Sequence, residues 1–239
     1  MAQKSKQWAA IIMMIALFAM IAFVTNLCSP MATIVKNQFG ASEAAGQIGN
    51  YANFIAYLVM GIPSGMLISK LGYKKTALAA LLVGLAGIVL EYLSGVMGSY
   101  WVYLGGAFIS GLCMCMLNTV VNPLLNVLGG GGKTGNQLIQ IGGAFNSAAA
   151  VAVYIMMGAL IGEVTKDTGI SDATPALIIA GAIFAVAFII LLFTKIEEPE
   201  QAPVELKPIT GALSFRQFAL GALAIFTYMR VEVGTPTYM

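Results

Sequence analysis

The sequence has no histidine, only three cysteines, and charged side chains at just 9% of its 239 positions. Cys28, Cys113 and Cys115 lie within or beside apolar stretches, and residues two apart on a helix, such as Cys113 and Cys115, point to different faces. No zinc or haem ligand set is therefore expected. The net charge of +2 provides no soluble basic face for nucleic acid. We expect no metal, no cofactor, no nucleic-acid partner and no catalytic site, so the chain is not predicted to be an enzyme.

Apolar residues, in contrast, make up 59% of the chain and give a mean hydropathy of +0.88. They fall into runs close to the roughly 20 residues that a helix needs to cross a bilayer. Because lipid offers no partners to backbone N–H and C=O groups, these spans must be helices. The fold class is therefore an all-α polytopic membrane protein, with the lipid bilayer as its surroundings. The predicted spans are Gln7–Phe23, Ile48–Ile68, Thr76–Met97, Tyr100–Leu117, Leu138–Ile161, Pro175–Phe193 and Phe215–Met239.

The basic residues predict the orientation of these spans. If consecutive spans alternate in direction, one side of the membrane holds only Lys36 and Lys166 as cations. The positive-inside rule then places the opposite side, with the N-terminus, in the cytoplasm, and the protein in the cell (inner) membrane. The residues predicted to be cytoplasmic are Lys4, Lys6, Lys70, Lys74, Lys75, Lys133, Lys195, Lys207 and Arg216.

One long polar segment separates the sixth and seventh spans. Residues 195–214 are rich in Glu and Pro and are expected to form a cytoplasmic linker without a packed core. Six helices, a linker and a further helix match a transporter built from two six-helix halves. We therefore expect a first domain at 1–194 and a seventh helix at 215–239, which begins a C-terminal half that is absent from the chain.

The connection between the second and third spans carries a compact pattern. Gly61-Ile-Pro-Ser-Gly65 is expected to end one helix, and its two glycines have the spacing that lets another backbone approach closely. In the turn that follows, Ser69-Lys-Leu-Gly-Tyr-Lys-Lys75, Gly72 provides the tight bend. The pattern resembles the loop signature of the major facilitator superfamily, G-x-x-x-D-R-x-G-R-K. The residues that correspond to this conformational loop are Gly61, Gly65, Lys70, Gly72, Lys74 and Lys75.

This chain departs from that signature at two positions. Ser69 stands where the family has Asp, and Lys70 where it has Arg. The charge contact made by the family's Asp is therefore missing or supplied from elsewhere. A lysine-rich turn unrelated to the family remains the alternative reading of this segment.

Three further motifs narrow the resemblance. The stretch Leu117-Asn-Thr-Val-Val-Asn-Pro-Leu-Leu-Asn-Val-Leu-Gly129 and the pentapeptide Gly143-Ala-Phe-Asn-Ser147 are similar to the fourth and fifth helices of the fucose–galactose–glucose branch. The ending Phe226-Thr-Tyr-Met-Arg-Val-Glu-Val-Gly234 is similar to that branch's seventh helix. The resemblance covers essentially the whole chain. It implies the N-terminal six-helix domain of a major facilitator fold plus a truncated seventh transmembrane helix, and transport of a sugar.

The amides in the spans fit that substrate on physical grounds alone. An amide in hydrocarbon is costly unless it finds a partner or lines water. Each Asn offers both a donor and an acceptor to a sugar hydroxyl, and Asn118 and Asn122 share a helical face. The alternative is that such amides only hold helices together. The predicted substrate-binding residues are Asn26, Asn53, Asn118, Asn122, Gln140 and Asn146.

Proton coupling is less clear from the sequence. In fucose-type members a carboxylate on helix one and another on helix four are thought to handle the proton, and these positions align with Ser29 and Asn118 here. The acids left as candidates are Glu91, Glu163 and Glu232, of which Glu232 is our ion-coupling candidate because an acid embedded in the membrane is functional by default. Transport independent of protons, facilitated or sodium-linked, is the other outcome.

The sequence thus predicts a secondary active or facilitative sugar transporter, in which binding of a hexose or deoxyhexose is followed by alternating access. Two alternatives remain open. One is a transporter for another small polar solute or a drug. The other is a membrane scaffold or sensor that transports nothing.

Overall fold

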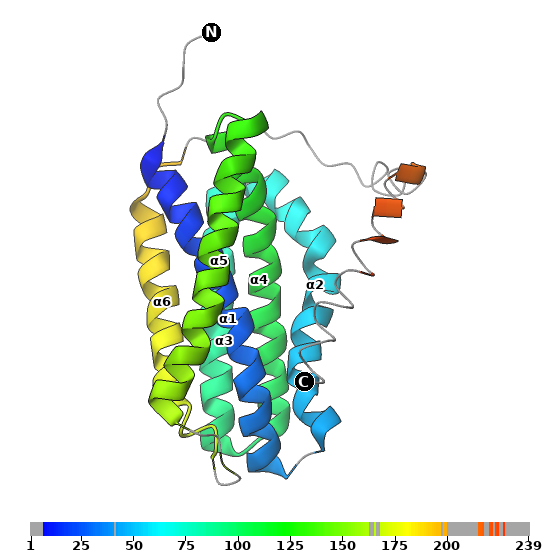
Figure 1. Ribbon diagram of the computed structural model, residues 1–239, viewed down its shortest axis with the longest axis vertical. Helices are drawn as coiled ribbons and strands as arrows, with labels where there is room; N and C mark the ends of the chain where they lie inside the picture. The colour runs from blue at the N-terminus through cyan, green and yellow to red at the C-terminus, as the bar shows by residue number, and fades with distance from the viewer. Residues whose placement is uncertain are drawn as a thin grey trace. The chain divides into compact units, whose positions relative to one another are not determined.

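The computed structural model describes residues 7–40, 42–162, 165, 168–196 and 198–199, and also 215–217, 220–221, 223–224 and 227. In the first of two compact units, residues 1–201, the described chain forms six helices that run alternately up and down (Figure 1). All six are long and apolar enough to cross a membrane. They are α1 (Trp8–Phe39), α2 (Glu43–Leu71), α3 (Tyr73–Met97), α4 (Tyr100–Leu128), α5 (Gly132–Ile161) and α6 (Thr174–Phe193).

Three of the predicted helix ends were wrong, because the helices continue through their prolines. The first span was predicted to stop at Phe23 and the fourth at Leu117, but α1 and α4 extend to Phe39 and Leu128. The stretch 61–65 does not end α2, which continues past Pro63 to Leu71. In a bundle, neighbouring helices and side chains satisfy the backbone groups that a proline frees, so proline and polar residues need not end a span.

Two of the connections between helices are very short, and the bend predicted at Gly72 is one of them. Gly72 alone separates α2 from α3, and Gly98–Ser99 separate α3 from α4. Gly72 has φ +88, a conformation that glycine adopts without the strain of a Cβ atom. On the opposite side of the bundle, the hydroxyl of Ser42 caps α2 by accepting a hydrogen bond from the Ala45 N–H at 3.2 Å. Such tight turns make consecutive helices antiparallel neighbours.

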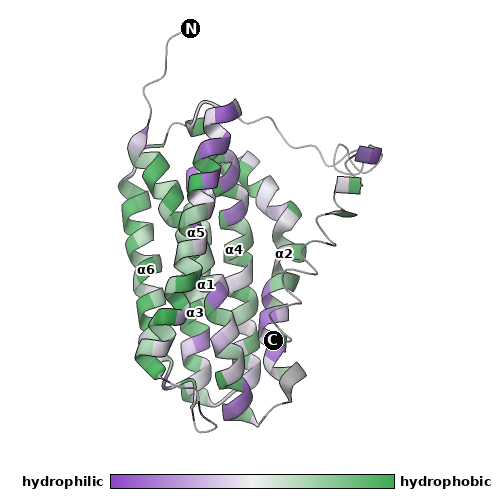
Figure 2. Cartoon of the chain, viewed as in Figure 1, coloured by the Kyte–Doolittle hydropathy of each residue, from purple (hydrophilic) through white to green (hydrophobic). Residues whose placement is uncertain are grey.

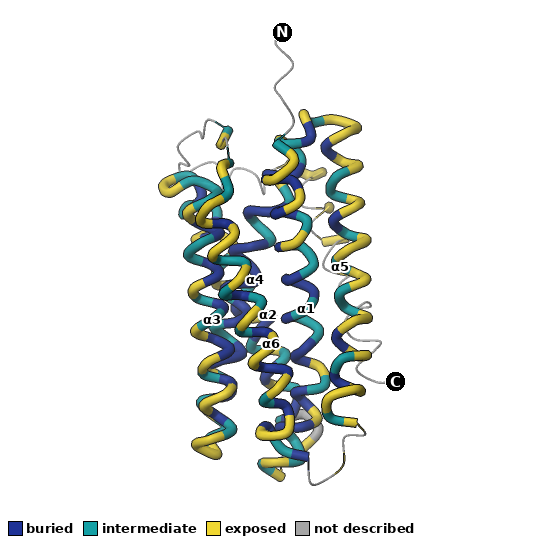
Figure 3. Tube along the Cα trace, turned by 90° about the vertical axis from the view of Figure 1, so that its left-hand side faces the viewer, coloured by how far each residue is buried: buried dark blue, intermediate teal, exposed yellow. Residues whose placement is uncertain are grey.

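The core of the bundle lies around α1 and α4. α4 packs on α3, α2, α1 and α5, while α1 packs mainly on α5 and α4. These two helices are the most buried, whereas α2 and α5 leave most of their surface uncovered (Figure 3). α3 and α4 come into close backbone contact at two glycines. A Cβ atom on Gly87 would lie 2.8 Å from the Ser110 backbone nitrogen, and one on Gly106 would lie 2.9 Å from the Glu91 backbone nitrogen.

The predicted linker begins as part of this bundle. Ile196 packs against the hydrophobic core and Glu198 contacts the start of α3; residues 200–214 lie outside the described residues. The second compact unit spans residues 202–239. Its described residues after Phe215 are helical, whereas most of the predicted seventh helix, including every residue of its C-terminal motif except Thr227, lies outside the described part of the chain.

Candidate substrate site

Two of the predicted asparagines meet on α4. The side-chain amide of Asn118 donates to the hydroxyl of Tyr57 on α2 at 2.9 Å, and that of Asn122 donates to the Asn118 backbone carbonyl at 3.0 Å. Both side chains are half-buried. The two side chains therefore lie on one face of α4, as the four-residue spacing predicts, and Asn118 is directed toward α2.

Asn53 on α2 connects these polar side chains to α1. Its amide nitrogen lies 3.3 Å from the sulfur of Cys28, and the side chain is only 2% exposed. The Asn53 amide oxygen and the Thr25 hydroxyl are both buried and have no hydrogen-bond partner among the described residues. Buried polar groups nearly always have a partner, so these two atoms have unused capacity to bind a polar group. Thr25 is three residues before Cys28, on the same face of α1.

We call these side chains the polar cluster. None of them carries a charge at neutral pH, and each can accept or donate a hydrogen bond. α4 and α2 come close enough here that a Cβ atom on Gly111 would lie 2.6 Å from the Asn53 carbonyl oxygen. The polar cluster comprises Thr25, Cys28, Asn53, Tyr57, Asn118 and Asn122.

Two other predicted binding residues use their amide nitrogens to bind helix backbones. Asn26 donates to the carbonyl of Ala22, one turn earlier on α1, at 2.8 Å. Asn146 on α5 donates to the carbonyl of Phe18 on α1 at 2.8 Å and so joins the two helices. The role of these amides as links within and between helices, which the sequence left open, is thus seen in the structure.

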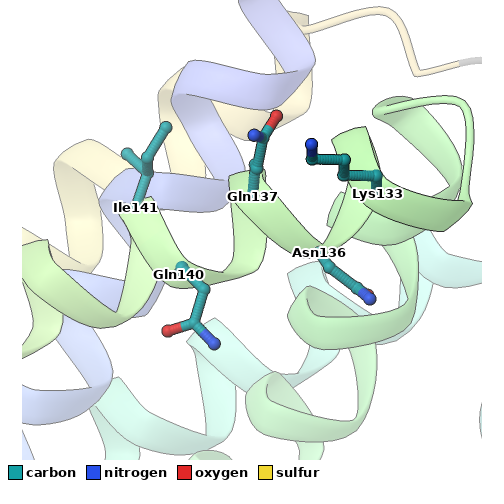
Figure 4. A pocket seen from close by; sticks show the side chains of 5 residues that line it. All are labelled: Lys133, Asn136, Gln137, Gln140 and Ile141. Atoms are coloured by element: carbon teal, nitrogen blue, oxygen red, sulfur yellow. The ribbon is translucent and has the colours of Figure 1, made fainter.

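Gln140 lies apart from the polar cluster. The first turns of α5 line an open groove formed by Lys133, Asn136, Gln137, Gln140 and Ile141. In Figure 4, Gln140 and Asn136 point to one side of α5, whereas Gln137 and Ile141 point to the other. Among the described residues, no hydrogen bond joins Gln140 to Asn118 or Asn122. It therefore belongs to an exposed polar face of α5.

The conformational loop is held by a residue that the motif did not include. Both carboxylate oxygens of Glu198 accept hydrogen bonds from the start of α3, from the Tyr73 N–H at 2.9 Å and the Lys74 N–H at 2.8 Å. The Lys74 ammonium donates to the carbonyl of Leu192, near the end of α6, at 2.9 Å. A Cβ atom on Gly72 would collide with the Glu198 carboxylate, so glycine here provides space as well as a tight turn.

The rest of the loop motif is open in this structure. A Cβ atom at Gly61 or Gly65 would meet nothing within 4 Å among the described residues, so the close backbone approach expected there is not seen. Lys70 and Lys75 are exposed. Between the two glycines, the buried hydroxyl of Ser64 lies 3.0 Å from that of Thr119 and links α2 to α4.

The predicted ion-coupling residue Glu232 lies outside the described residues. Of the two positions aligned with carboxylates in fucose-type members, Ser29 is exposed on α1, and Asn118 donates to Tyr57. Thr25 and Cys28 belong to no motif, so neither was predicted from the sequence to bind substrate. Their position three residues apart on a helix that also carries Asn26 and Ser29 was the available signal.

The six alternating apolar helices, with uncharged polar groups between them, define a multi-pass helical membrane protein. The family model described as Major Facilitator Superfamily matches residues 12–239. The chain belongs to the major facilitator superfamily.

Its relatives include sugar transporters. The chain is 26% identical over 230 residues to the glucose/galactose transporter of Brucella abortus biovar 1 (strain 9-941), covering 93% of this chain and 55% of the relative. It is 23% identical over 250 residues to the L-fucose-proton symporter of Escherichia coli (strain K12), covering 94% of this chain and 57% of the relative. The chain thus spans little more than half the length of the curated relatives it matches.

The fold has solved counterparts. A crystal structure of a variant of the E. coli fucose:proton symporter, FucP, superimposes with a TM-score of 0.69 at 20% identity. The match covers 92% of this chain and 56% of that one. A second FucP structure, in the outward conformation, gives 0.67 at 21% identity over 79% of this chain and 50% of that one. These matches confirm the fold class predicted from the sequence.

Proposed function

We propose that the protein transports a hexose or deoxyhexose across the cytoplasmic membrane by alternating access. The observation that carries this proposal is the polar cluster, which gathers uncharged amides and hydroxyls from α1, α2 and α4 inside an apolar bundle. A sugar needs many neutral donors and acceptors at once, and asparagine provides both in one side chain. The names of the relatives, glucose/galactose transporter and L-fucose-proton symporter, support the same substrate class.

The unpartnered atoms of the polar cluster suit this role. A buried acceptor without a hydrogen bond is unfavourable, so the Asn53 amide oxygen gains from a ligand hydroxyl or an ordered water molecule. Asn118 and Asn122 are half-buried, which leaves part of each side chain accessible. We infer that Asn118 and Asn122 contact the sugar directly and that Asn53 contacts it directly or through water.

The partner in this proposal is a second six-helix half. α2 and α5 are long and apolar enough to cross a membrane but are buried over only 17% and 11% of their most apolar windows. In transporters of this architecture the substrate lies near the bilayer midplane, between two halves that rock against each other. The surfaces of α2 and α5 are the ones we assign to that interface, with residues 195–214 as the connecting linker and residues 215–239 as the start of the second half.

The basic residues support an orientation with the N-terminus in the cytoplasm. Lys70, Lys74, Lys75, Lys133 and Lys195 lie at the same end of the bundle, where α1 begins and α6 ends (Figure 1). Cytoplasmic loops carry an excess of lysine and arginine. We therefore assign this end of the bundle to the cytoplasmic side. The membrane that we assign to the protein is the inner membrane of the cell.

The direct test of the polar cluster is sugar binding by the complete transporter that contains this chain. Asn122→Ala and Asn118→Ala should each weaken binding of the transported sugar by roughly 5- to 150-fold, because losing one hydrogen-bond partner in a buried site costs about 1–3 kcal/mol. Equilibrium binding of radiolabelled D-glucose, D-galactose and L-fucose to the purified protein measures this effect.

The matched control for Asn122→Ala is Asn126→Ala. Asn126 lies one turn further along α4, but its amide donates to Asn136 at 3.0 Å, at the α4–α5 turn. This variant should retain sugar affinity. If Asn118→Ala and Asn122→Ala are expressed normally and keep their sugar affinity, neither residue belongs to the binding site. If Asn126→Ala loses as much affinity as they do, the loss reflects folding and not sugar contact.

A further inference from the structure

A carboxyl group lies buried between α3 and α4. Glu91 is 6% exposed, and its Oε1 atom accepts a hydrogen bond from the Ser110 hydroxyl at 3.0 Å. Within the described residues, no lysine or arginine forms an ion pair with it. The backbone carbonyl of Glu91 is also hydrogen-bonded, because it accepts from the Ser94 hydroxyl at 2.6 Å.

Two glycines allow the backbones of α3 and α4 to pack closely beside Glu91. The positions where α3 and α4 nearly touch, Gly87 and Gly106, flank the carboxyl: a Cβ atom on Gly106 would lie 2.8 Å from the Glu91 Cγ atom, and Gly87 faces Ser110. The helices are therefore too close here to admit a third side chain or much water. Where α3 meets α4, the carboxyl is therefore bordered by glycine backbone and the Ser110 hydroxyl.

The titratable groups that face Glu91 from neighbouring helices are uncharged at neutral pH. They are the Cys28 thiol of α1 and the Tyr103 phenol of α4, both buried and close enough to interact electrostatically with the carboxyl. No described cation is available to stabilise an ionised Glu91. Cys28 is also the residue whose sulfur contacts Asn53, so Glu91 lies within electrostatic range of the polar cluster.

An ionised carboxylate with a single hydroxyl donor is very unfavourable in so apolar a place. A protonated carboxyl, in contrast, is neutral and can accept from Ser110. Release of the proton would place a charge at this close α3–α4 contact, where only loosening of the contact or entry of water would stabilise it. The protonation state of Glu91 is thereby tied to the packing of α3 on α4.

We propose that Glu91 is the proton-binding group that couples transport to a proton gradient in this protein, at a position different from the two aligned with family carboxylates. A proton from water on one side forms the carboxyl O–H bond, and in the other conformation that bond breaks and the proton passes to water on the opposite side. The inference rests on the proposed sugar transport. It assigns the coupling role to α3 instead of Ser29, Asn118 or Glu232.

The first measurement does not depend on transport. Infrared difference spectroscopy of the purified protein in lipid, recorded across a pH titration, detects the carbonyl band of a protonated carboxyl. Glu91→Gln should remove a band that titrates, while Glu198→Gln, which changes an exposed acid, should leave it. A spectrum in which no titrating band depends on Glu91 would overturn the proposal even if the protein transports sugar.

The second measurement separates coupling from sugar transport. In proteoliposomes of the complete transporter, Glu91→Gln should abolish proton-driven accumulation of sugar yet retain sugar exchange without a gradient, whereas Glu91→Asp should retain part of the accumulation. Glutamine still accepts from Ser110, so a purely structural Glu91 would leave accumulation unchanged, and that result contradicts the proposal. Absence of exchange in the unaltered protein would instead refute the sugar substrate.

A third variant covers failure of Glu91→Gln to fold. Ser110→Ala keeps the acid and removes its only described side-chain donor. It should shift the pH at which half-maximal proton-driven uptake occurs, because that donor stabilises the ionised carboxylate. Unaltered pH dependence in a well-expressed Ser110→Ala protein would count against a proton at Glu91.

Discussion

Helices α5 and α6 both leave most of their surface uncovered in the bundle, yet they expose different chemistry. The most apolar window of α6 has a mean hydropathy of 3.1, against 1.8 for α5. α6 exposes large apolar side chains such as Ile178, Val186 and Phe193. α5 exposes amides and hydroxyls from its start to its middle, including Gln137, Gln140 and Ser147, together with apolar side chains such as Ile155 further along. Figure 2 shows the contrast, with α6 hydrophobic along its length and α5 hydrophilic toward its start.

The exposed fraction of a helix in this bundle therefore does not by itself identify a surface that faces lipid. Lipid accepts the apolar face of α6, whereas polar groups within a membrane face other helices or water. The same reasoning explains why the polar cluster lies among α1, α2 and α4. α5 therefore faces the transport path or a second half in our account, and α6 faces lipid.

The largest expected effect comes from a charge placed on each face. Val186→Asp, near the middle of α6, should destabilise membrane insertion by about 2.5–3.5 kcal/mol, the cost of an aspartate at the centre of a span. Ser147→Asp, at the middle of α5, should destabilise insertion much less because in our account this position contacts water or protein instead of lipid. The inserted fraction of each helix, measured in a translocon assay on the whole chain, gives both values. Equal costs would remove the distinction between the two helices.

A second prediction concerns the two ends of α5. Lys133 begins the helix on the proposed cytoplasmic side, and the exposed Ser171 lies in the loop after its other end. In a background with the native cysteines replaced, Cys28 by Ser to keep an acceptor for Asn53, a cysteine at Ser171 should react with an impermeant thiol reagent applied to intact cells. A cysteine at Lys133 should react only after the cells are opened. The reverse pattern would invert the orientation.

The smallest expected effect is at the end of α6. Glu198→Gln keeps the shape of the side chain but weakens its hydrogen bonds to the start of α3, and it removes a negative charge from a helix N-terminus. Such a charge contributes about 0.3–1 kcal/mol, so the melting temperature should fall slightly. Asp172→Asn, whose carboxylate accepts from Gly169 in a loop after α5, provides a control of the same chemistry. A larger loss in the control would show that Glu198 does not hold the loop.

Much of this fold was predictable because the bilayer imposes a length on every span. Apolar runs therefore revealed the six helices and their alternation, but not the ends of α1, α2 and α4. Pro30, Pro63 and Pro123 look like helix ends when only local sequence is considered. Neighbouring helices, which the sequence does not display, allow the backbone to continue.

The site was predictable only in part, since the residue type of an amide does not determine its partner. Asn118 and Asn122 lie together as their spacing predicted, but Asn146 binds the backbone of Phe18, and Gln140 faces an open groove. The contacts of Cys28 with Asn53 and of Glu198 with Lys74 join residues 25 and 124 positions apart. Such pairs arise from the packing of whole helices and have no local signal.

Sugar exchange tests the central claim most directly. Proteoliposomes of the complete transporter, preloaded with unlabelled sugar, are given radiolabelled D-glucose, D-galactose or L-fucose, and labelled sugar inside is followed over time. Our account predicts faster entry of at least one of these sugars than in protein-free vesicles, competition by the same unlabelled sugar outside, and strongly reduced entry in Asn122→Ala at subsaturating sugar. Entry of all three sugars at the protein-free rate, in protein that is folded and correctly inserted, would contradict the account.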